Sequence, residues 1–343
     1  MRRWLAGFIV GIIVLAGALV AWFRWELATP YYGAESAETF VDIPHGAGTV
    51  AIADALVGAR MLRHRLPFVL YVRWRGVARR LQAGEYRFEA PVRPADIVER
   101  MIRGDIYYRT VTIPEGLTAR ETVSLIARNG LGNEKELNQL LLKTEWIADL
   151  DPAAASLEGY LFPDTYRFSR RATSEEILKT LVQEFRARTS KLLAPALLPR
   201  GWSLPRIVTL ASLIEKEAKS AGDRRLVASV LINRLRLKMP LGCDPTIIYV
   251  LKQAGTFDGN LRKSDLGIDS PYNTYLHQGL PPGPIANPGL DSLDAALSPA
   301  ASDFLYYVSR NDGTHVFSKD FRSHANAVER YQKRGSRSKV RMP

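Results

Sequence analysis

Twenty consecutive uncharged residues, Trp4 to Phe23, follow the opening Met1-Arg2-Arg3 and constrain this chain more than any other feature. As an α-helix the run would be about 30 Å long, close to the hydrocarbon thickness of a bilayer. Tryptophans lie near both of its ends, where aromatic rings favour the membrane interface. We therefore predict a cytoplasmic N-terminus and transmembrane anchor over residues 1–26, with the chain beyond it outside the membrane.

Two other interpretations of this run are weaker. A cleaved signal peptide normally has an apolar region of about 7–15 residues followed by small residues. Here the run is longer and ends in Trp22-Phe23-Arg24-Trp25. A core helix of a soluble domain would be apolar on one face, whereas this run is apolar on all sides and lies at the N-terminus. An uncleaved anchor is the favoured interpretation.

Composition and charge limit the class of protein and its partners. The chain is 46% hydrophobic and 24% charged, which argues against wholesale disorder and against a polytopic membrane protein. Its 343 residues suggest about two domains. A net charge of +12 predicts an anionic partner. Nucleic acid would explain the charge but not export, whereas a membrane surface and an anionic wall polymer explain both, so we expect no nucleic acid.

Metal, cofactor and nucleophile signatures are missing from the sequence. The single cysteine, Cys243, excludes an intrachain disulfide and a Cys-rich zinc site, and it is expected to be a small buried residue. The five histidines lack the HExxH spacing, and neither a GxSxG elbow nor a P-loop occurs. We expect no metal and no cofactor.

A six-residue pattern occurs twice, as Val41-Asp-Ile-Pro-His-Gly46 and Val111-Thr-Ile-Pro-Glu-Gly116. Each copy precedes a helical segment, at 50–62 and 119–127, so two strand–turn–helix units are predicted. Shared turn chemistry alone could also produce so short a similarity. The second helix has the capping box Thr118-x-x-Glu121 at its start.

Other elements follow from local patterns. Residues 83–88 predict a turn and strand, and residues 94–102 a short helix. Beyond residue 109 helices dominate, including one opened by Thr173-x-x-Glu176 and one starting at Asp223. Residues 240–289 are dense in proline and glycine and predict loops and turns. The fold class is therefore α+β.

The helix predicted from Ser203 to Ala218 carries the strongest candidate for chemistry. Glu217 follows Ile214 and Leu213 by three and four positions, so it shares their apolar face. Burial penalises an ionised carboxyl, raises its pKa and keeps a general acid protonated near neutral pH. Glu215 falls at the edge of that face, and Lys216 points away. The alternative is that Glu217 reaches solvent or a salt bridge.

Aromatic and polar clusters elsewhere in the sequence are typical of the lining of a binding cleft. One alternates rings and acids from Glu158 to Tyr166, and another is Tyr272-Asn273-Thr274-Tyr275, followed by the rigid loop 279–285. Rings and amides suit sugars, but such loops suit tight structural turns equally well. Asn233 lies in an apolar helix, where a buried amide needs partners and a structural hydrogen bond is an equal alternative.

Several long motifs together resemble one family. They are Leu210-Ala-Ser-Leu-Ile-Glu-Lys-Glu217, Val227-Ala-Ser-Val-Leu-Ile-Asn-Arg-Leu235, Asp244-Pro-Thr-Ile-Ile-Tyr249, Pro271-Tyr-Asn-Thr-Tyr275, Gly279-Leu-Pro-Pro-Gly-Pro-Ile285 and Asp312-Gly-Thr-His-Val-Phe317. The chain is similar in these to the YceG-like family, whose members are endolytic murein transglycosylases of the MltG type. The likeness runs from the anchor to about residue 332. Gly242-Cys243, just before Asp244, is a variable spot in the motif.

The resemblance implies an organisation and a location. It implies a single-pass protein of the inner membrane whose body is periplasmic. A small LysM-like α/β module is expected at 38–108 and a mainly helical catalytic domain with β and loop elements at 109–332. Residues 333–343 form a basic tail outside the resemblance, which we expect to be disordered.

The resemblance also implies an activity. The family cleaves the β-1,4 bond between N-acetylmuramic acid and N-acetylglucosamine within nascent glycan strands and leaves 1,6-anhydromuramoyl ends. Its catalytic glutamate falls on Glu217, with Glu215 as the fallback, acting first as acid and then as base. Association with peptidoglycan synthases is the partner expectation. Residues assigned weakly to substrate binding are Glu158, Tyr160, Asn233, Asp244, Tyr272 and Asn273.

Two rival functions stay open at this point. The first is a hydrolase of the same polymer, with Asp244 or Glu158 as a second carboxylate. The second is an anchored, non-catalytic glycan-binding scaffold. A pure binder has no need for an acid on an apolar helix face, which favours the enzyme.

Overall fold

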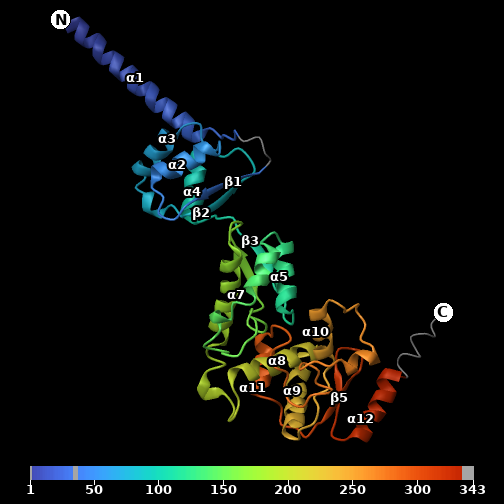
Figure 1. The fold of residues 1–343 in the computed structure, drawn as a ribbon. Coiled ribbons are helices and arrows are strands. Elements are labelled where there is room, and N and C mark those ends of the chain that lie inside the picture. The colour runs from blue at the N-terminus through green and yellow to red at the C-terminus, as the bar shows by residue number, and fades with distance from the viewer. Residues whose placement is uncertain (1, 34–37, 334–343) are drawn as a thin grey trace. The chain divides into compact units, whose positions relative to one another are not determined.

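The structure is a computed structural model that describes residues 2–33 and 38–333 (Figure 1). The chain divides into two compact units, Met1–Arg109 and Thr110–Pro343, and each has its own hydrophobic core. The tail expected to be disordered lies outside the described residues, apart from the backbone of Lys333.

The first unit begins with the long helix α1 (Arg2–Ala28). Its segment Gly7–Ala28 is long and apolar enough to cross a membrane, and its side chains are exposed along most of that length. This is compatible with the predicted anchor. Near the end of α1, Glu26 and Leu27 are buried against the rest of the unit, where α1 contacts α3 and α4.

The rest of the first unit is a two-stranded sheet with helices. Its elements are β1 (Thr39–Ile43), α2 (Thr49–Gly58), α3 (Arg65–Trp74), a 3₁₀ turn (Ala78–Arg80), β2 (Gly84–Phe88) and α4 (Pro94–Arg103). The strands are antiparallel, with Thr39 opposite Phe88 and Ile43 opposite Gly84. Val41 and Ile43 of β1 are buried, as are Glu85, Tyr86 and Phe88 of β2. The LysM-like nature of this unit stays a prediction.

The second unit is mainly helical. Its strands are β3 (Arg109–Thr112, at the boundary between the units), β4 (Thr165–Phe168), β5 (Tyr306–Ser309) and β6 (His315–Ser318). Its α-helices are α5 (Ala119–Arg128), α6 (Glu134–Leu140), α7 (Ser174–Thr189), α8 (Leu204–Glu217), α9 (Ala221–Arg236), α10 (Asp244–Ala254), α11 (Leu290–Leu297) and α12 (Phe321–Val328). Short 3₁₀ turns lie at 144–146, 195–197 and 263–267, and a π-helical turn at 329–333.

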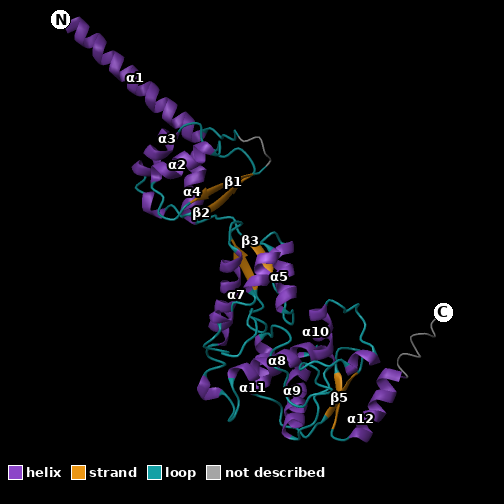
Figure 2. Cartoon of the chain, viewed as in Figure 1, coloured by secondary structure: helices purple, strands orange, loops and turns teal. Residues whose placement is uncertain are grey.

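Mixed helix and sheet is therefore confirmed as the fold class (Figure 2). Within the described residues the strands form three two-stranded sheets, β1–β2, β3–β4 and β5–β6. Both copies of the repeated pattern are a strand followed by a turn and a helix, as predicted. The capping boxes at Thr118 and Thr173 are also confirmed, since each hydroxyl accepts from the backbone N–H three residues on.

Helix boundaries required corrections. The region 240–289, predicted to be loop, contains α10, because Pro245 fits the first helical turn and apolar residues follow it at helical spacing. Helix α9 begins at Ala221, two residues before the predicted Asp223. Helix α2 ends at Gly58 rather than continuing to Leu62.

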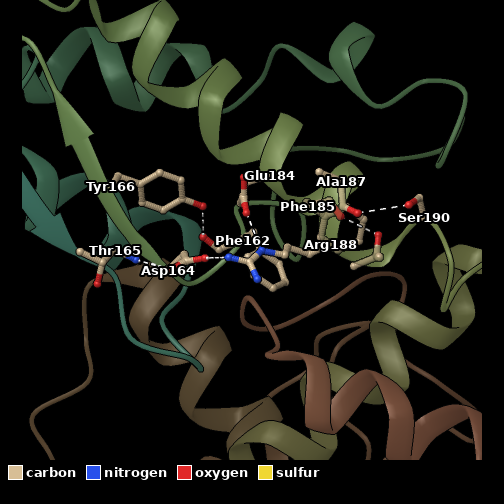
Figure 3. A network of polar contacts seen from close by, with 10 residues as sticks. Phe162, Asp164, Thr165, Tyr166, Glu184, Phe185, Ala187, Arg188 and Ser190 are labelled. Atoms are coloured by element: carbon tan, nitrogen blue, oxygen red, sulfur yellow. Dashed lines mark hydrogen bonds and ion pairs between the residues drawn. The ribbon is translucent and has the colours of Figure 1, made fainter. Parts of the chain in front are cut away.

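A polar network fixes the segment that leads into β4 (Figure 3). Arg188, at the end of α7, binds Asp164 at 2.7 Å and Glu184 at 2.6 Å. The Tyr166 hydroxyl donates to the Phe162 carbonyl at 2.7 Å. Asp164 is thereby tied to α7, whereas the backbone around Glu158 is held by Asn287, whose side-chain oxygen accepts from the Gly159 and Leu161 N–H groups at 2.9 and 3.1 Å.

Candidate active site

Glu217 is the last residue of α8, a helix in which every residue from 207 to 214 is buried. Pro205 lies in its first turn, a favoured position for proline. The Ser212 hydroxyl, buried in mid-helix, accepts from the Ile285 backbone N–H at 3.1 Å and ties α8 to the 279–285 loop. Glu217 itself is partly buried. The packing of α8 thus delivers its terminal carboxyl to a protected position rather than to bulk solvent.

The Glu217 carboxyl is surrounded by groups from three separate segments. The Tyr307 hydroxyl on β5 and the Cys243 thiol, which itself donates to the Leu241 carbonyl at 3.8 Å, lie beside it, and the Asp244 carboxylate lies nearby at the start of α10. Desolvation and then the Asp244 charge raise the pKa of Glu217 to about 7, against the lowering effect of the hydroxyl, the thiol and Arg234. The group therefore exists in both protonation states near neutral pH.

Arg234 and Tyr275 organise the other side of this cluster. The Arg234 guanidinium donates to the Leu305 and Leu241 carbonyls, each at 2.7 Å, and so joins α9 to the loops that carry Tyr307 and Asp244. The Tyr275 hydroxyl donates to the Asp244 carboxylate. Asp244 is exposed. The acid is thus enclosed on one side, while a second carboxylate is held at the solvent edge.

Glu215 is placed differently. Its carboxylate accepts from the Gly289 backbone N–H at 3.0 Å and lies 3.7 Å from the Arg224 guanidinium. Its neighbour Lys216 is partly buried and donates to the Gly116 carbonyl at 2.8 Å, so it does not face open solvent. These contacts give both residues a structural role in joining α8 to neighbouring loops.

Glu158 lies in a separate buried position at the start of α5. Its carboxyl accepts from the Ala119 backbone N–H at 2.8 Å and from the Tyr249 hydroxyl. Desolvation raises the pKa of Glu158 to about 8, although the Ala119 hydrogen bond opposes the shift. The group is therefore largely a neutral carboxylic acid at pH 7, able to donate as well as accept hydrogen bonds.

A cavity of about 710 Å³ opens beside Glu158, between α5 and α10. Such a volume lies within the range of about 300–1,000 Å³ found for small-molecule sites. The Tyr249 and Tyr272 rings line it with their centroids 5.1 Å apart. Its polar wall is completed by the amides and hydroxyls of Asn138, Gln253, Ser124, Ser156 and Ser270 and by one cation, Arg120. Rings beside hydrogen-bonding groups suit a polyhydroxyl ligand, and Arg120 adds one positive charge to the wall.

Helix α10 connects the surroundings of Glu217 with the cavity beside Glu158. Asp244 at its first position belongs to the Glu217 cluster, and Tyr249 faces the cavity. Five residues along a helix correspond to a rise of about 7.5 Å and a rotation of about 140°. One rigid element therefore forms a wall of both.

The remaining weakly predicted substrate residues are engaged inside the fold. Tyr160 is fully buried and donates to Asp151 at 2.9 Å. The Asn233 amide donates to the Ser302 and Phe304 carbonyls at 2.8 and 3.0 Å. Asn273 is fully buried and donates to two carbonyls of the 266–268 turn. Their polar atoms serve internal contacts, and their part in substrate binding stays a prediction.

Sequence reasoning missed Tyr307 and Arg234 as neighbours of Glu217. Tyr307 lies in β5, a strand not predicted from the sequence, and it is 90 residues from the acid along the chain. Arg234 lies within a quoted motif, but its role depends on loop carbonyls that only the fold brings together. The paired rings Tyr306-Tyr307 before a β-branched residue were the one available signal.

The surroundings of Glu217 and the cavity beside Glu158 are suited to different functions. A carboxyl with a pKa near 7 can give a proton to a leaving group and take one back. The Glu158 cavity offers shape, rings and hydrogen bonding, which bind and orient. Among the described residues, no group of three or more His, Cys, Asp or Glu side chains is positioned to hold a metal ion.

Comparison with known proteins identifies relatives over most of the chain. The model of the YceG-like family matches residues 41–330. An endolytic murein transglycosylase of Bacillus subtilis is 33% identical over 335 residues, covering 93% of this chain and 91% of the relative. One of Streptococcus pneumoniae is 32% identical over 301 residues, which cover 78% of this chain but 54% of the longer relative. The crystal structure of a YceG-like protein of Listeria monocytogenes is 31% identical, covers 84% of this chain and 98% of its own, and superposes with a TM-score of 0.58.

Proposed function

This chain belongs to the YceG-like family, and we propose that it is a membrane-anchored enzyme that cleaves glycan strands of peptidoglycan internally. Its relatives of known name are murein transglycosylases, so the chain is a lytic transglycosylase that acts on peptidoglycan. The finer proposal is that it cuts the β-1,4 bond between N-acetylmuramic acid and N-acetylglucosamine, with Glu217 as the only catalytic carboxyl.

The proposed reaction uses one proton twice. Protonated Glu217 donates to the glycosidic oxygen while the bond from that oxygen to C1 of the muramic acid breaks. The C6 hydroxyl of the same sugar then attacks C1, and its proton passes to the Glu217 carboxylate. The products are a free 4-hydroxyl and a 1,6-anhydro end, and no water is consumed. Because the nucleophile belongs to the reacting sugar, it starts close to its target.

The observation that carries this proposal is the state of the Glu217 carboxyl. A pKa of about 7 leaves the acid half protonated at neutral pH, whereas an ordinary glutamate would be almost wholly ionised. The Tyr307 hydroxyl stabilises the carboxylate left after the first proton transfer. Donor and acceptor functions can therefore alternate in one side chain, as the two steps require.

The cavity beside Glu158 supports substrate binding in this scheme. Tyr249 and Tyr272 present apolar ring faces to a sugar, and neutral Glu158 can hydrogen-bond an N-acetyl or hydroxyl group. Asp244 stabilises positive charge near C1 through its carboxylate. A glycan strand bound across the Glu158 cavity and Glu217 would have its scissile bond oriented toward the acid.

A hydrolase is the second candidate, because Asp244 places another carboxylate beside Glu217. A two-carboxylate mechanism would use Asp244 as base or nucleophile and add water to the product. Hydrolytic products would then be heavier by one water than anhydro products. The Asp244→Asn variant would lose activity as completely as Glu217→Gln, whereas the one-carboxylate scheme predicts only a partial loss.

The test uses the full-length protein in detergent, purified glycan strands and mass spectrometry of the products. We expect anhydro ends from the wild type, none from Glu217→Gln, and unchanged amounts from Glu175→Gln, a control that alters an exposed acid on α7. Full lytic activity in Glu217→Gln would refute the assignment of the acid. No new ends from the wild type would favour the non-catalytic scaffold instead.

The location and partners belong to the same proposal. Helix α1 would anchor the chain in the inner membrane with the N-terminus cytoplasmic and the body periplasmic, where the substrate lies. The first unit would act as the LysM-like module at 38–108 and the second as the catalytic domain at 109–332. Peptidoglycan synthases are the proposed protein partners, since they produce the nascent strands.

A further inference from the structure

Helix α3 exposes a line of large apolar side chains. Leu66, Leu70 and Trp74 are 55%, 43% and 79% exposed. They are four residues apart, so they share one face of the helix. The opposite face, with Phe68 and Val72, is fully buried in the core of the first unit. The helix is therefore apolar on two sides, one covered by the fold and one uncovered.

The uncovered face adjoins the anchor. A cavity of about 740 Å³ is lined by Val20 and Phe23 of α1 together with Tyr71 and Trp74 of α3. Val20 and Phe23 belong to the apolar run expected to cross the membrane. If that run lies in the bilayer, Trp74 lies at the depth of its last turns, because both line one cavity.

Specific contacts hold α3 against the end of α1. His64 Nδ1, just before α3, lies 3.3 Å from the buried Glu26 carboxylate of α1. The Arg63 guanidinium stacks over the Trp25 ring at 5.2 Å from its centroid. These contacts fix the start of α3 beside the anchor, so α3 cannot turn away from the membrane independently.

The segment that contains α3 is strongly basic, although Arg65 pairs with Asp54 and Arg75 pairs with Glu99. Residues 55–84 contain seven arginines, at 60, 63, 65, 73, 75, 79 and 80, and no aspartate or glutamate. In the described parts of the chain, Arg73, Arg79 and Arg80 form no ion pair. An apolar stripe bordered by free guanidinium groups is typical of a helix at an anionic bilayer surface.

We propose that α3 lies in the interface of the same bilayer that α1 spans, with Leu66, Leu70 and Trp74 among the acyl chains and with Arg73, Arg79 and Arg80 against anionic headgroups. The first unit is then held to the membrane by two elements, α1 and α3, rather than by α1 alone. This inference rests on the anchoring in the proposed function, but not on the catalytic assignment.

Depth-dependent fluorescence quenching tests the placement. The full-length chain, with Cys243→Ser to remove its one thiol, is reconstituted into vesicles of phosphatidylglycerol and phosphatidylcholine. A fluorophore is attached at Trp74→Cys, at Val14→Cys in the middle of the span, or at Tyr108→Cys, an exposed aromatic site near the β1–β2 sheet. The quencher is a nitroxide on the lipid acyl chains. Trp74 is mostly exposed, so its replacement removes little packing.

We expect quenching at Trp74→Cys to be about half or more of that at Val14→Cys, since interfacial helices lie about 5–10 Å into the headgroup boundary. Tyr108→Cys should be unquenched. Quenching at Val14→Cys but not at Trp74→Cys would overturn the proposal and leave the anchor intact. Quenching at neither site would overturn the anchor, and the proposal with it. Quenching at Tyr108→Cys as strong as at Trp74→Cys would also overturn it, since contact would not be specific to α3.

Lipid composition tests the charge component. Vesicles of phosphatidylcholine alone should reduce quenching at Trp74→Cys and leave Val14→Cys unchanged, because the arginines lose their anionic partners. The triple variant Arg73→Gln, Arg79→Gln, Arg80→Gln in anionic vesicles should give the same reduction. Equal quenching in all these cases would refute the role of anionic headgroups.

Discussion

Replacing Glu217 with glutamine should stabilise the fold at neutral and alkaline pH while it removes activity. The wild-type carboxyl has a pKa of about 7 in the folded state and about 4.5 when unfolded. Between these values the folded chain keeps a proton that the unfolded chain has lost, so stability falls as pH rises. Glutamine has nearly the same shape and does not ionise, so the variant escapes this loss.

The magnitude follows from the two pKa values. A difference of about 2.5 units corresponds to about 3 kcal/mol. Partial exposure of Glu217 to solvent screens the charge and reduces the effect, so we expect about 1–2 kcal/mol. The advantage of the variant should be absent near pH 4, grow up to about pH 7 and stay constant above it.

Denaturant unfolding of the full-length protein in detergent, followed from about pH 5 to about pH 8, measures this difference. The matched control is Glu215→Gln, two residues earlier on α8. Its carboxylate lies 3.7 Å from Arg224 and accepts from a backbone N–H, so that variant should be less stable than wild type. A Glu217→Gln protein that is no more stable than wild type at pH 8, or whose advantage does not change with pH, would refute the reasoning.

Three further predictions concern the surroundings of the site. Asp244→Asn should lower the pKa of Glu217, because the Asp244 charge raises it. The alkaline limb of the pH–kcat profile should then move to lower pH. A limb that does not move would contradict the electrostatic coupling between Asp244 and Glu217. Tyr272→Ala should raise KM for glycan strands about tenfold, or about 1.4 kcal/mol, with little change in kcat, if the cavity binds sugar; an unchanged KM would remove the cavity from the substrate path. Thr118→Ala should cost about 1 kcal/mol in chemical denaturation through loss of the cap of α5, whereas Thr118→Ser should retain it.

The sequence predicted local features of the site well. The apolar stripe of α8 placed Glu217 on a protected face, and the two capping boxes marked the starts of α5 and α7. Each of these depends on residues three or four positions apart, so the information is contained in a short segment. The burial of the acid could be inferred because a helix has a fixed period.

Contacts between distant segments could not be predicted in this way. Tyr307 on β5 and Asp244 on α10 are 90 and 27 residues away from Glu217 in the sequence, and no local pattern records that they come together. Tyr160 illustrates the opposite error. Its position among alternating rings and acids resembled a cleft, but its hydroxyl is satisfied by Asp151 inside the core. The sequence around a tyrosine that lines a cleft can be the same as that around a tyrosine buried in the core. Only the hydrogen-bond partner of the hydroxyl distinguishes the two.

Helix α10 gives the enzyme a mechanical link between recognition and chemistry. Asp244 and Tyr249 are parts of one stiff rod, so a sugar that displaces the ring on one side also moves the carboxylate on the other. A shift of that carboxylate changes how tightly Glu217 holds its proton. Binding of a ligand in the cavity would thus change the pKa of Glu217 before any bond is broken. A non-cleavable saccharide should therefore make the protein take up or release protons on binding.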